Sequence, residues 1–220
     1  MVRINKTGEI SIKLLYWGCI GSGKKTIIDT LYRIAKEGKY GEEIIPTGNP
    51  KPIAMVSGSS LYTDRGVFQS KKHSKIFYHI YIVGGHARFS PLRKKIFLGT
   101  DGVIFVFDGQ RSRIKDNIHY LKELKNVTGN KLISEIPMLV MLNKQDLPNP
   151  VTKSEVYEIL FQENMAYPKG HSLNIWNPEV YETIGLYSNA QDVYKVFAEL
   201  ARRTAIYQAI GNGKAPDTRF

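Results

Sequence analysis

A glycine-rich stretch, residues 18–24, has the residue types and the spacing of a phosphate-binding loop. It matches the pattern G-x-x-x-x-G-K, in which backbone N–H groups curl around phosphate oxygens and the lysine, here Lys24, reaches the β- and γ-phosphates. A helix that starts at such a loop adds a favourable dipole. We therefore predict that phosphate groups are bound by Gly18, Gly21, Ser22, Gly23, Lys24, Lys25 and Thr26.

The position after the loop lysine departs from the usual motif. A serine or threonine normally stands there because its hydroxyl coordinates Mg²⁺, whereas this chain has Lys25 followed by Thr26. An ammonium group only donates hydrogen bonds and cannot coordinate a cation. Two explanations stay open: Lys25 turns outward and a water takes its place, or its charge replaces part of the metal's role at the phosphates.

A second motif, Asn143-Lys144-Gln145-Asp146, directly follows an apolar run and matches N-K-x-D. A carboxylate at Asp146 can accept hydrogen bonds from N1–H and the exocyclic amino group of guanine, a pair of donors that adenine does not offer on that edge. Lys144 is expected along the plane of the base, and Asn143 is expected to tie this loop to the phosphate loop. Together the two motifs predict guanine-nucleotide binding.

The elements that must position these motifs alternate along the chain. Apolar runs predict strands at 10–16, 76–83, 102–107 and 138–142, and helical spacing predicts helices at 26–36, 114–124, 154–161 and 193–210. Strands that are apolar on both faces are typical of a parallel sheet covered by helices. We therefore predict the α/β class: a three-layer P-loop domain with a central, mostly parallel six-stranded sheet.

Two stretches do not fit this alternation. Residues 39–60 are rich in proline and glycine and are expected to form a loop, and residues 165–186 are unusually rich in Tyr, Pro and Asn for a connection. We divide the chain into an N-terminal segment (1–9), a nucleotide-binding domain (10–210) with an insertion expected at 162–186, and a C-terminal tail (211–220).

With these motifs in place, the chain resembles the Ras superfamily of small GTPases. It looks most like the ADP-ribosylation-factor (Arf) branch and the MglA-like GTPases of bacteria and archaea. The resemblance rests on residues 18–31, 81–107 and 143–148, which share order and spacing with these families. It implies a GTP/GDP switch whose effectors and regulators bind segments 44–64 and 82–97.

The same resemblance assigns further residues. It implies that 82–86, Ile-Val-Gly-Gly-His, occupy the second-switch motif with Gly85 at the nucleotide, and that Gly185 and Leu186 belong to the last base-contacting loop. His86 stands where a glutamine usually orients the attacking water. Histidine can do this work, and the alternative is a surface histidine on a loop.

The metal site is where the resemblance is weakest. Ile82 stands where the family has the aspartate that holds Mg²⁺ through water, so we expect Mg²⁺ to keep only phosphate oxygens, waters and at most one first-switch hydroxyl, and to bind weakly. The first-switch hydroxyl aligns best with Ser60, and Thr47 and Thr63 are alternatives. Ser59 stands where the MglA type places its catalytic arginine.

These features predict GTP hydrolysis that is slow without a partner and support His86 as the one candidate catalytic residue. A pseudoGTPase, an interaction scaffold that binds GTP without appreciable turnover, is the main alternative because of Lys25 and Ile82. An ATP-using small-molecule kinase is disfavoured by Asp146 and by the lack of a second acidic catalytic cluster.

The composition fits a cytoplasmic globular protein. The 220 residues include one cysteine, Cys19, which fits a reducing compartment, and no run long enough to span a membrane. Neither end has a signal peptide, a myristoylation glycine or a prenylation box. The net charge of +11 is spread along the chain with no basic-aromatic platform, so we expect no nucleic-acid binding, with weak membrane-surface contact as the alternative.

Overall fold

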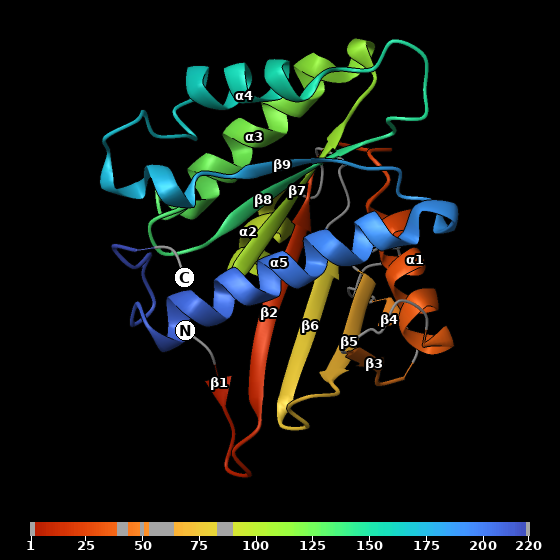
Figure 1. Cartoon of the computed structure of the whole chain (residues 1–220), viewed down its shortest axis with the longest axis vertical. Helices are drawn as coiled ribbons and strands as arrows, with labels where there is room; N and C mark the ends of the chain where they lie inside the picture. The colour runs from red at the N-terminus through yellow and green to blue at the C-terminus, as the bar shows by residue number, and fades with distance from the viewer. Residues whose placement is uncertain (1–2, 39–43, 49–50, 53–63, 83–89, 219–220) are drawn as a thin grey trace.

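A nine-stranded mixed sheet forms the centre of the computed structural model, which describes residues 3–38, 44–48, 51–52, 64–82 and 90–218. The main path of the sheet has the order β3-β5-β6-β2-β7-β8-β9 (Figure 1). The strands are β1 (Arg3–Ile4), β2 (Ile10–Trp17), β3 (Ile44–Pro46), β4 (Lys51–Pro52), β5 (Asp64–Ser70), β6 (Ile76–Ile82), β7 (Gly102–Asp108), β8 (Met138–Asn143) and β9 (Glu179–Glu182).

The predicted mostly parallel sheet is confirmed and is wider than expected. Strands β6, β2, β7, β8 and β9 run parallel, and β5 pairs antiparallel with β6, which together make the six expected strands. Three short strands extend the sheet, since β1 pairs with β2, and β3 and β4 both pair with β5.

The loop predicted for 39–60 is wrong at residues 44–46 and 51–52, which form β3 and β4. Both strands pair only with β5, and each ends in a proline, Pro46 or Pro52. Proline lacks an N–H donor, but an edge strand needs hydrogen bonds on one side only, so proline is tolerated there. The prolines that suggested a loop therefore mark short edge strands.

Helices cover both faces of the sheet and confirm the three-layer α/β fold (Figure 1). Helices α1 and α5 pack on one face, α2 and α3 lie on the other, and α4 packs beside β9. The helices are α1 (Lys24–Glu37), α2 (Ser90–Phe97), α3 (Ile114–Thr128), α4 (Lys153–Gln162) and α5 (Ala190–Ala209), with short 3₁₀ turns η3 (Arg111–Arg113), η4 (Ser172–Trp176) and η5 (Tyr187–Asn189). Among the described helices, none is both long and apolar enough to cross a membrane.

The middle of the sheet holds the site in place. Every residue of β7 and of β8 is buried, so both strands contact helices on their two faces, as their continuous apolar sequences predicted. Because β2, β6, β7 and β8 are parallel, their carboxyl ends lie at one edge of the sheet. The motifs of both predicted loops follow these ends, which is where open α/β sheets bind ligands.

Part of segment 162–186 belongs to the central sheet. It contains β9, which pairs with β8, and η4, whose Trp176 is buried in the core. The Trp176 indole N–H donates to the carbonyl of Pro216 at 2.6 Å, and the Ala215 N–H donates to the Ser134 carbonyl at 2.8 Å. The described part of the C-terminal tail is therefore bound to this side of the domain.

Candidate functional site

The loop between β2 and α1 has the backbone conformation that its glycines predict. Gly18, Gly21 and Gly23 have φ values of 149°, 76° and 96°, in the region that favours glycine. A Cβ atom on Gly18 would lie 2.3 Å from the Val106 carbonyl oxygen, and one on Gly23 would lie 2.3 Å from the Asn143 amide nitrogen. Glycine at these two positions is therefore required by close approach to β7 and β8 as well as by φ.

Lys24 is bound to the inside of this loop. Its Nζ donates to the carbonyls of Gly18 (2.8 Å) and Cys19 (2.7 Å) and to the Ser22 hydroxyl (3.3 Å), and the residue is only 6% exposed. Burial lowers the Lys24 pKa to about 8. A phosphate next to this ammonium would favour its charged form. The ammonium group is therefore held in place and poorly solvated, as expected of a group that binds phosphate.

Asn143 joins the base loop to its neighbours. Its Nδ2 donates to the Ser22 carbonyl at 2.8 Å, and its Oδ1 accepts from the Gly185 N–H at 2.7 Å. The Thr30 hydroxyl of α1 donates to the Gly185 carbonyl at 2.8 Å. The structure therefore brings together the phosphate loop, the N-K-x-D motif and the last predicted loop, through one buried amide.

Lys144 has a partner that the sequence reasoning missed. Its Nζ lies 2.7 Å from Oδ2 of Asp108, which is 1% exposed at the end of β7. Lys144 has φ of 66°, a left-handed conformation that costs a non-glycine residue of order 1 kcal/mol and is typical of functional loops. The sequence did contain a hint of this ion pair, because an aspartate directly follows the apolar run 102–107.

A pocket of about 310 Å³ opens between these loops. Asp146 is exposed at it, and Leu147, Ile184 and Leu186 provide apolar surface, so it combines a carboxylate with walls that a flat base can contact. The lining residues are Gly21, Gly23, Thr26, Asn143, Lys144, Asp146, Leu147, Ile184, Gly185 and Leu186. The lining thus joins the phosphate loop (Gly21, Gly23) to the loop that carries Asp146.

At the two expected metal positions the chain has a lysine and an isoleucine in place of a hydroxyl and a carboxylate. Lys25 is exposed at the start of α1, and Thr26 is exposed and lines the pocket. Ile82 ends β6, is 6% exposed, and belongs to the same apolar cluster as Tyr16, its neighbour in register on β2. The described residues include no group of three or more His, Cys, Asp or Glu side chains that could hold a metal.

Some predicted site residues lie outside the described residues, namely Ser60, Gly85 and His86, and so does the alternative Thr63. Thr47 lies within the described residues and hydrogen-bonds to the neighbouring strand at the edge of the sheet. Its hydroxyl donates to the Val67 carbonyl of β5 at 3.1 Å, and its N–H donates to the same oxygen at 2.9 Å.

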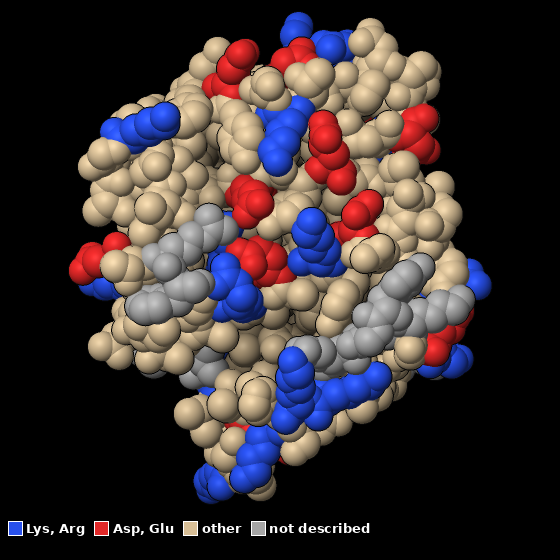
Figure 2. All heavy atoms as spheres, in the orientation of Figure 1, with Lys and Arg blue, Asp and Glu red and all other residues tan. Residues whose placement is uncertain are grey.

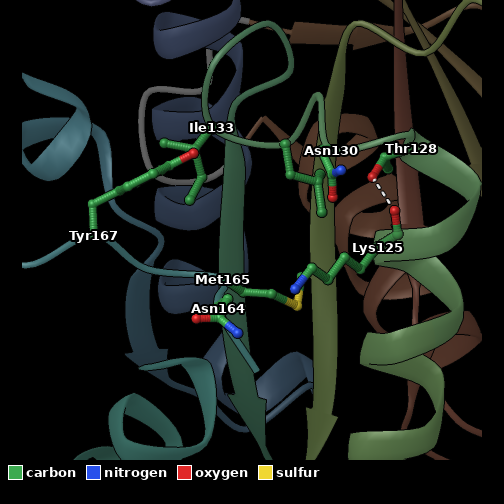
Figure 3. A pocket seen from close by; sticks show the side chains of 8 residues that line it. Lys125, Thr128, Asn130, Ile133, Asn164, Met165 and Tyr167 are labelled. Atoms are coloured by element: carbon green, nitrogen blue, oxygen red, sulfur yellow. Dashed lines mark hydrogen bonds between the residues drawn. The ribbon is translucent and has the colours of Figure 1, made fainter. Parts of the chain in front are cut away.

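Another cavity, of about 210 Å³, lies between α3 and the residues around 132 and 165 (Figure 3). Two of its polar side chains have partners inside the protein. The Lys125 Nζ donates to the Glu163 carbonyl at 2.7 Å, and the Thr128 hydroxyl donates to the Lys125 carbonyl at 2.7 Å. It shares no residue with the nucleotide pocket, so we assign the site to the loops around Lys24 and Asp146.

Comparison with known proteins agrees with this geometry. The sequence pattern of the ADP-ribosylation factor family matches residues 2–196 of the chain. The mutual gliding-motility protein MglA of Myxococcus xanthus (strain DK1622) is 30% identical over 167 residues, which cover 71% of this chain and 79% of that relative. The chain therefore belongs to the ADP-ribosylation factor family and is a small GTP-binding switch protein.

Proposed function

We propose that this protein switches between GTP- and GDP-bound states and hydrolyses GTP slowly unless a partner assists. The observation that carries the proposal is the bridge made by Asn143, which holds the phosphate loop and the base loop around one pocket. In this proposal Lys24 and the loop amides bind the phosphates, Asp146 selects guanine, and His86 orients the attacking water.

The slow rate follows from the metal position. Mg²⁺ normally stabilises charge on the β- and γ-phosphates during transfer. Here an exposed lysine and a buried isoleucine, Lys25 and Ile82, take the places of its usual hydroxyl and carboxylate support. Any Mg²⁺ would be held mainly by the nucleotide and by water, and its contribution would be correspondingly small.

The alternative is a pseudoGTPase that binds GTP and presents a fixed surface to its partners. It is favoured by the same two residues, because loss of metal support removes a main source of transition-state stabilisation. The two proposals share the nucleotide and differ in turnover, and therefore in whether the protein switches between two states.

The experiment is to release the nucleotide from purified protein, identify it by mass spectrometry, and follow hydrolysis of added GTP over hours. We expect guanine nucleotide near one per chain and slow conversion of GTP to GDP. Bound adenine nucleotide would contradict the base assignment. Bound GTP that stays intact, even with cell extract and excess Mg²⁺, would favour the pseudoGTPase.

We further propose that segments 44–64 and 82–97 contact effectors and regulators. We also propose that the protein works in the cytoplasm, where its one cysteine, buried and free, stays reduced.

The end of the sheet opposite the nucleotide pocket is positively charged. Figure 2 shows Lys and Arg side chains grouped at the lower end of the molecule, while acidic side chains lie mostly in the upper part of that face.

This basic end is formed by the β1–β2 and β5–β6 turns, which lie side by side because the Ile10 N–H donates to the Lys75 carbonyl at 2.7 Å. Its exposed lysines are Lys6, Lys71, Lys72 and Lys75. A lysine near an anionic membrane contributes about 1 kcal/mol, so the group would give weak contact. The contact should appear with anionic but not neutral vesicles, and should be lost when all four lysines are changed to glutamine.

A further inference from the structure

Three successive carbonyls of the phosphate loop are held by cations. Lys24 Nζ accounts for those of Gly18 and Cys19, at 2.8 and 2.7 Å. The third, the carbonyl of Ile20, accepts from a guanidinium N–H of Arg113 at 2.8 Å. Arg113 comes from the 3₁₀ turn η3 before α3, far from the loop in sequence, and the proposed function gives it no role.

The Ile20 backbone needs such a restraint. The Ile20 side chain is 42% exposed, so burial of the side chain does little to fix this part of the loop. The next residue, Gly21, has φ of 76°, and a Cβ built on it would meet no atom within 4 Å, so packing does not hold it either. The Ser22 N–H donates to the Cys19 carbonyl at 3.3 Å across this turn. The shorter Arg113 hydrogen bond is a second contact that fixes the outer turn of the loop.

Arg113 is itself oriented. Its other terminal nitrogen lies 2.7 Å from Oδ2 of Asp116, one turn further along α3, and the Arg113 side chain is 33% exposed. Two positions earlier, Arg111 turns away from the loop and pairs with Glu155 of α4 at 2.7 Å. The two arginines share one turn and nearly the same exposure, and only Arg113 touches the loop.

We propose that Arg113 is a positioning residue of the phosphate loop. By holding the Ile20 carbonyl outward, it leaves the loop amides free to face the β-phosphate of the nucleotide, and it adds a positive charge beside the loop. The inference rests on the proposed function, because it concerns how strongly the same pocket holds the diphosphate.

The test compares GDP with GMP, which lacks the β-phosphate, in binding titrations of purified protein. A hydrogen bond to a charged donor contributes enough to affinity that Arg113→Ala should weaken GDP binding about 10- to 100-fold. Binding of GMP should change less than about threefold, because GMP does not use this part of the loop. Arg113→Lys should restore part of the loss, since lysine can donate to one carbonyl but cannot also pair with Asp116 in the same geometry.

Arg111→Ala is the matched control and should bind GDP and GMP as wild type does. If Arg113→Ala binds GDP as tightly as wild type, the inference is wrong while the proposed function stands. If it loses GDP and GMP equally, Arg113 has only a structural role and the inference is also wrong. Failure of the wild type to bind any guanine nucleotide would instead contradict the proposed function, and the inference with it.

Discussion

The two halves of the nucleotide pocket differ in how completely they follow the family pattern. On the base side, Asn143 bridges two loops and Lys144 is anchored on buried Asp108, so each motif residue except the exposed Asp146 is fixed by the protein. On the metal side, Lys25 is exposed and Ile82 is buried among apolar residues. The motif residues of the base side other than Asp146 therefore have partners within the protein, and the proposed function assigns weak metal support to the other side.

This difference has a structural basis. The base loop follows β8, whose residues are all buried, as are those of its neighbour β7, and it is tied to Gly185 beyond β9. The expected metal position lies between the start of α1 and the end of β6. It is on the side of the sheet where the antiparallel strands β3 and β5 lie. Because separate loops provide the two functions, substitution at one need not disturb the other.

The largest expected effect is the loss of phosphate binding in Lys24→Ala, since both halves depend on this loop. The ammonium provides charge-assisted hydrogen bonds, and removing it should weaken GDP and GTP binding about 1000-fold or more. Lys36→Ala, at an exposed lysine of the same helix, is the control and should bind normally. Co-purification of the Lys24 variant with nucleotide at wild-type stoichiometry would disprove the phosphate-loop assignment.

The base side can be tested separately with Asp146→Ala. The carboxylate would make two charge-assisted hydrogen bonds to guanine, and losing them should cost roughly 2–4 kcal/mol, or about 30- to 1000-fold in affinity for GTP. Binding of ATP should not fall, so selectivity should disappear. Asp146→Asn, which keeps the shape and only one acceptor, should lie between wild type and Ala. Unchanged preference for GTP in the alanine variant would be inconsistent with the proposed role of Asp146.

In the proposed function, hydrolysis should depend on His86. His86→Ala should leave GTP affinity within a few-fold and lower turnover about 100-fold, as is typical when a group that orients or deprotonates water is removed. His86→Gln should keep much of the rate, because glutamine can also orient water. Equal single-turnover rates in wild type and the alanine variant would return His86 to the role of a surface histidine.

The sequence predicted the elements whose signal is local. The strand 102–107, the strand 138–142 and the helix 114–124 were found because continuous apolar runs and helical spacing need no tertiary information. β5 (Asp64–Ser70) and β9 (Glu179–Glu182) were missed, because they carry polar residues and become strands by pairing with β6 and β8. Tertiary pairing overrides weak local preference in such strands.

The site divides in the same way. Motif residues such as Lys24 and Asn143 could be named because their spacing within one short loop carries the chemistry. Asp108, Thr30 and Arg113 contact the loops of the site from other elements, 36, 155 and 93 residues away from their partners, and no sequence spacing reveals such contacts. They became visible only when the folded sheet brought the loops together.

The smallest expected effect is that of Mg²⁺ removal on nucleotide release. It is the most direct test of the difference between the base side and the metal side. With Lys25 and Ile82 in place of the usual ligand and its support, Mg²⁺ would keep only phosphate oxygens, waters and at most a first-switch hydroxyl, and the nearby ammonium would repel it weakly through solvent. We therefore expect excess EDTA to change the rate of nucleotide release by less than about tenfold.

Lys25→Thr is the variant that tests this explanation. It should restore part of the Mg²⁺ dependence by supplying a hydroxyl, but not all of it while Ile82 remains at the end of β6. The measurement is the release rate of fluorescent GDP in excess Mg²⁺ and in excess EDTA, for both proteins. Release from wild type that accelerates a hundredfold in EDTA would mean that a metal is held after all. Thr26 or the first switch would then have to supply its ligand, and the metal side would be as complete as the base side.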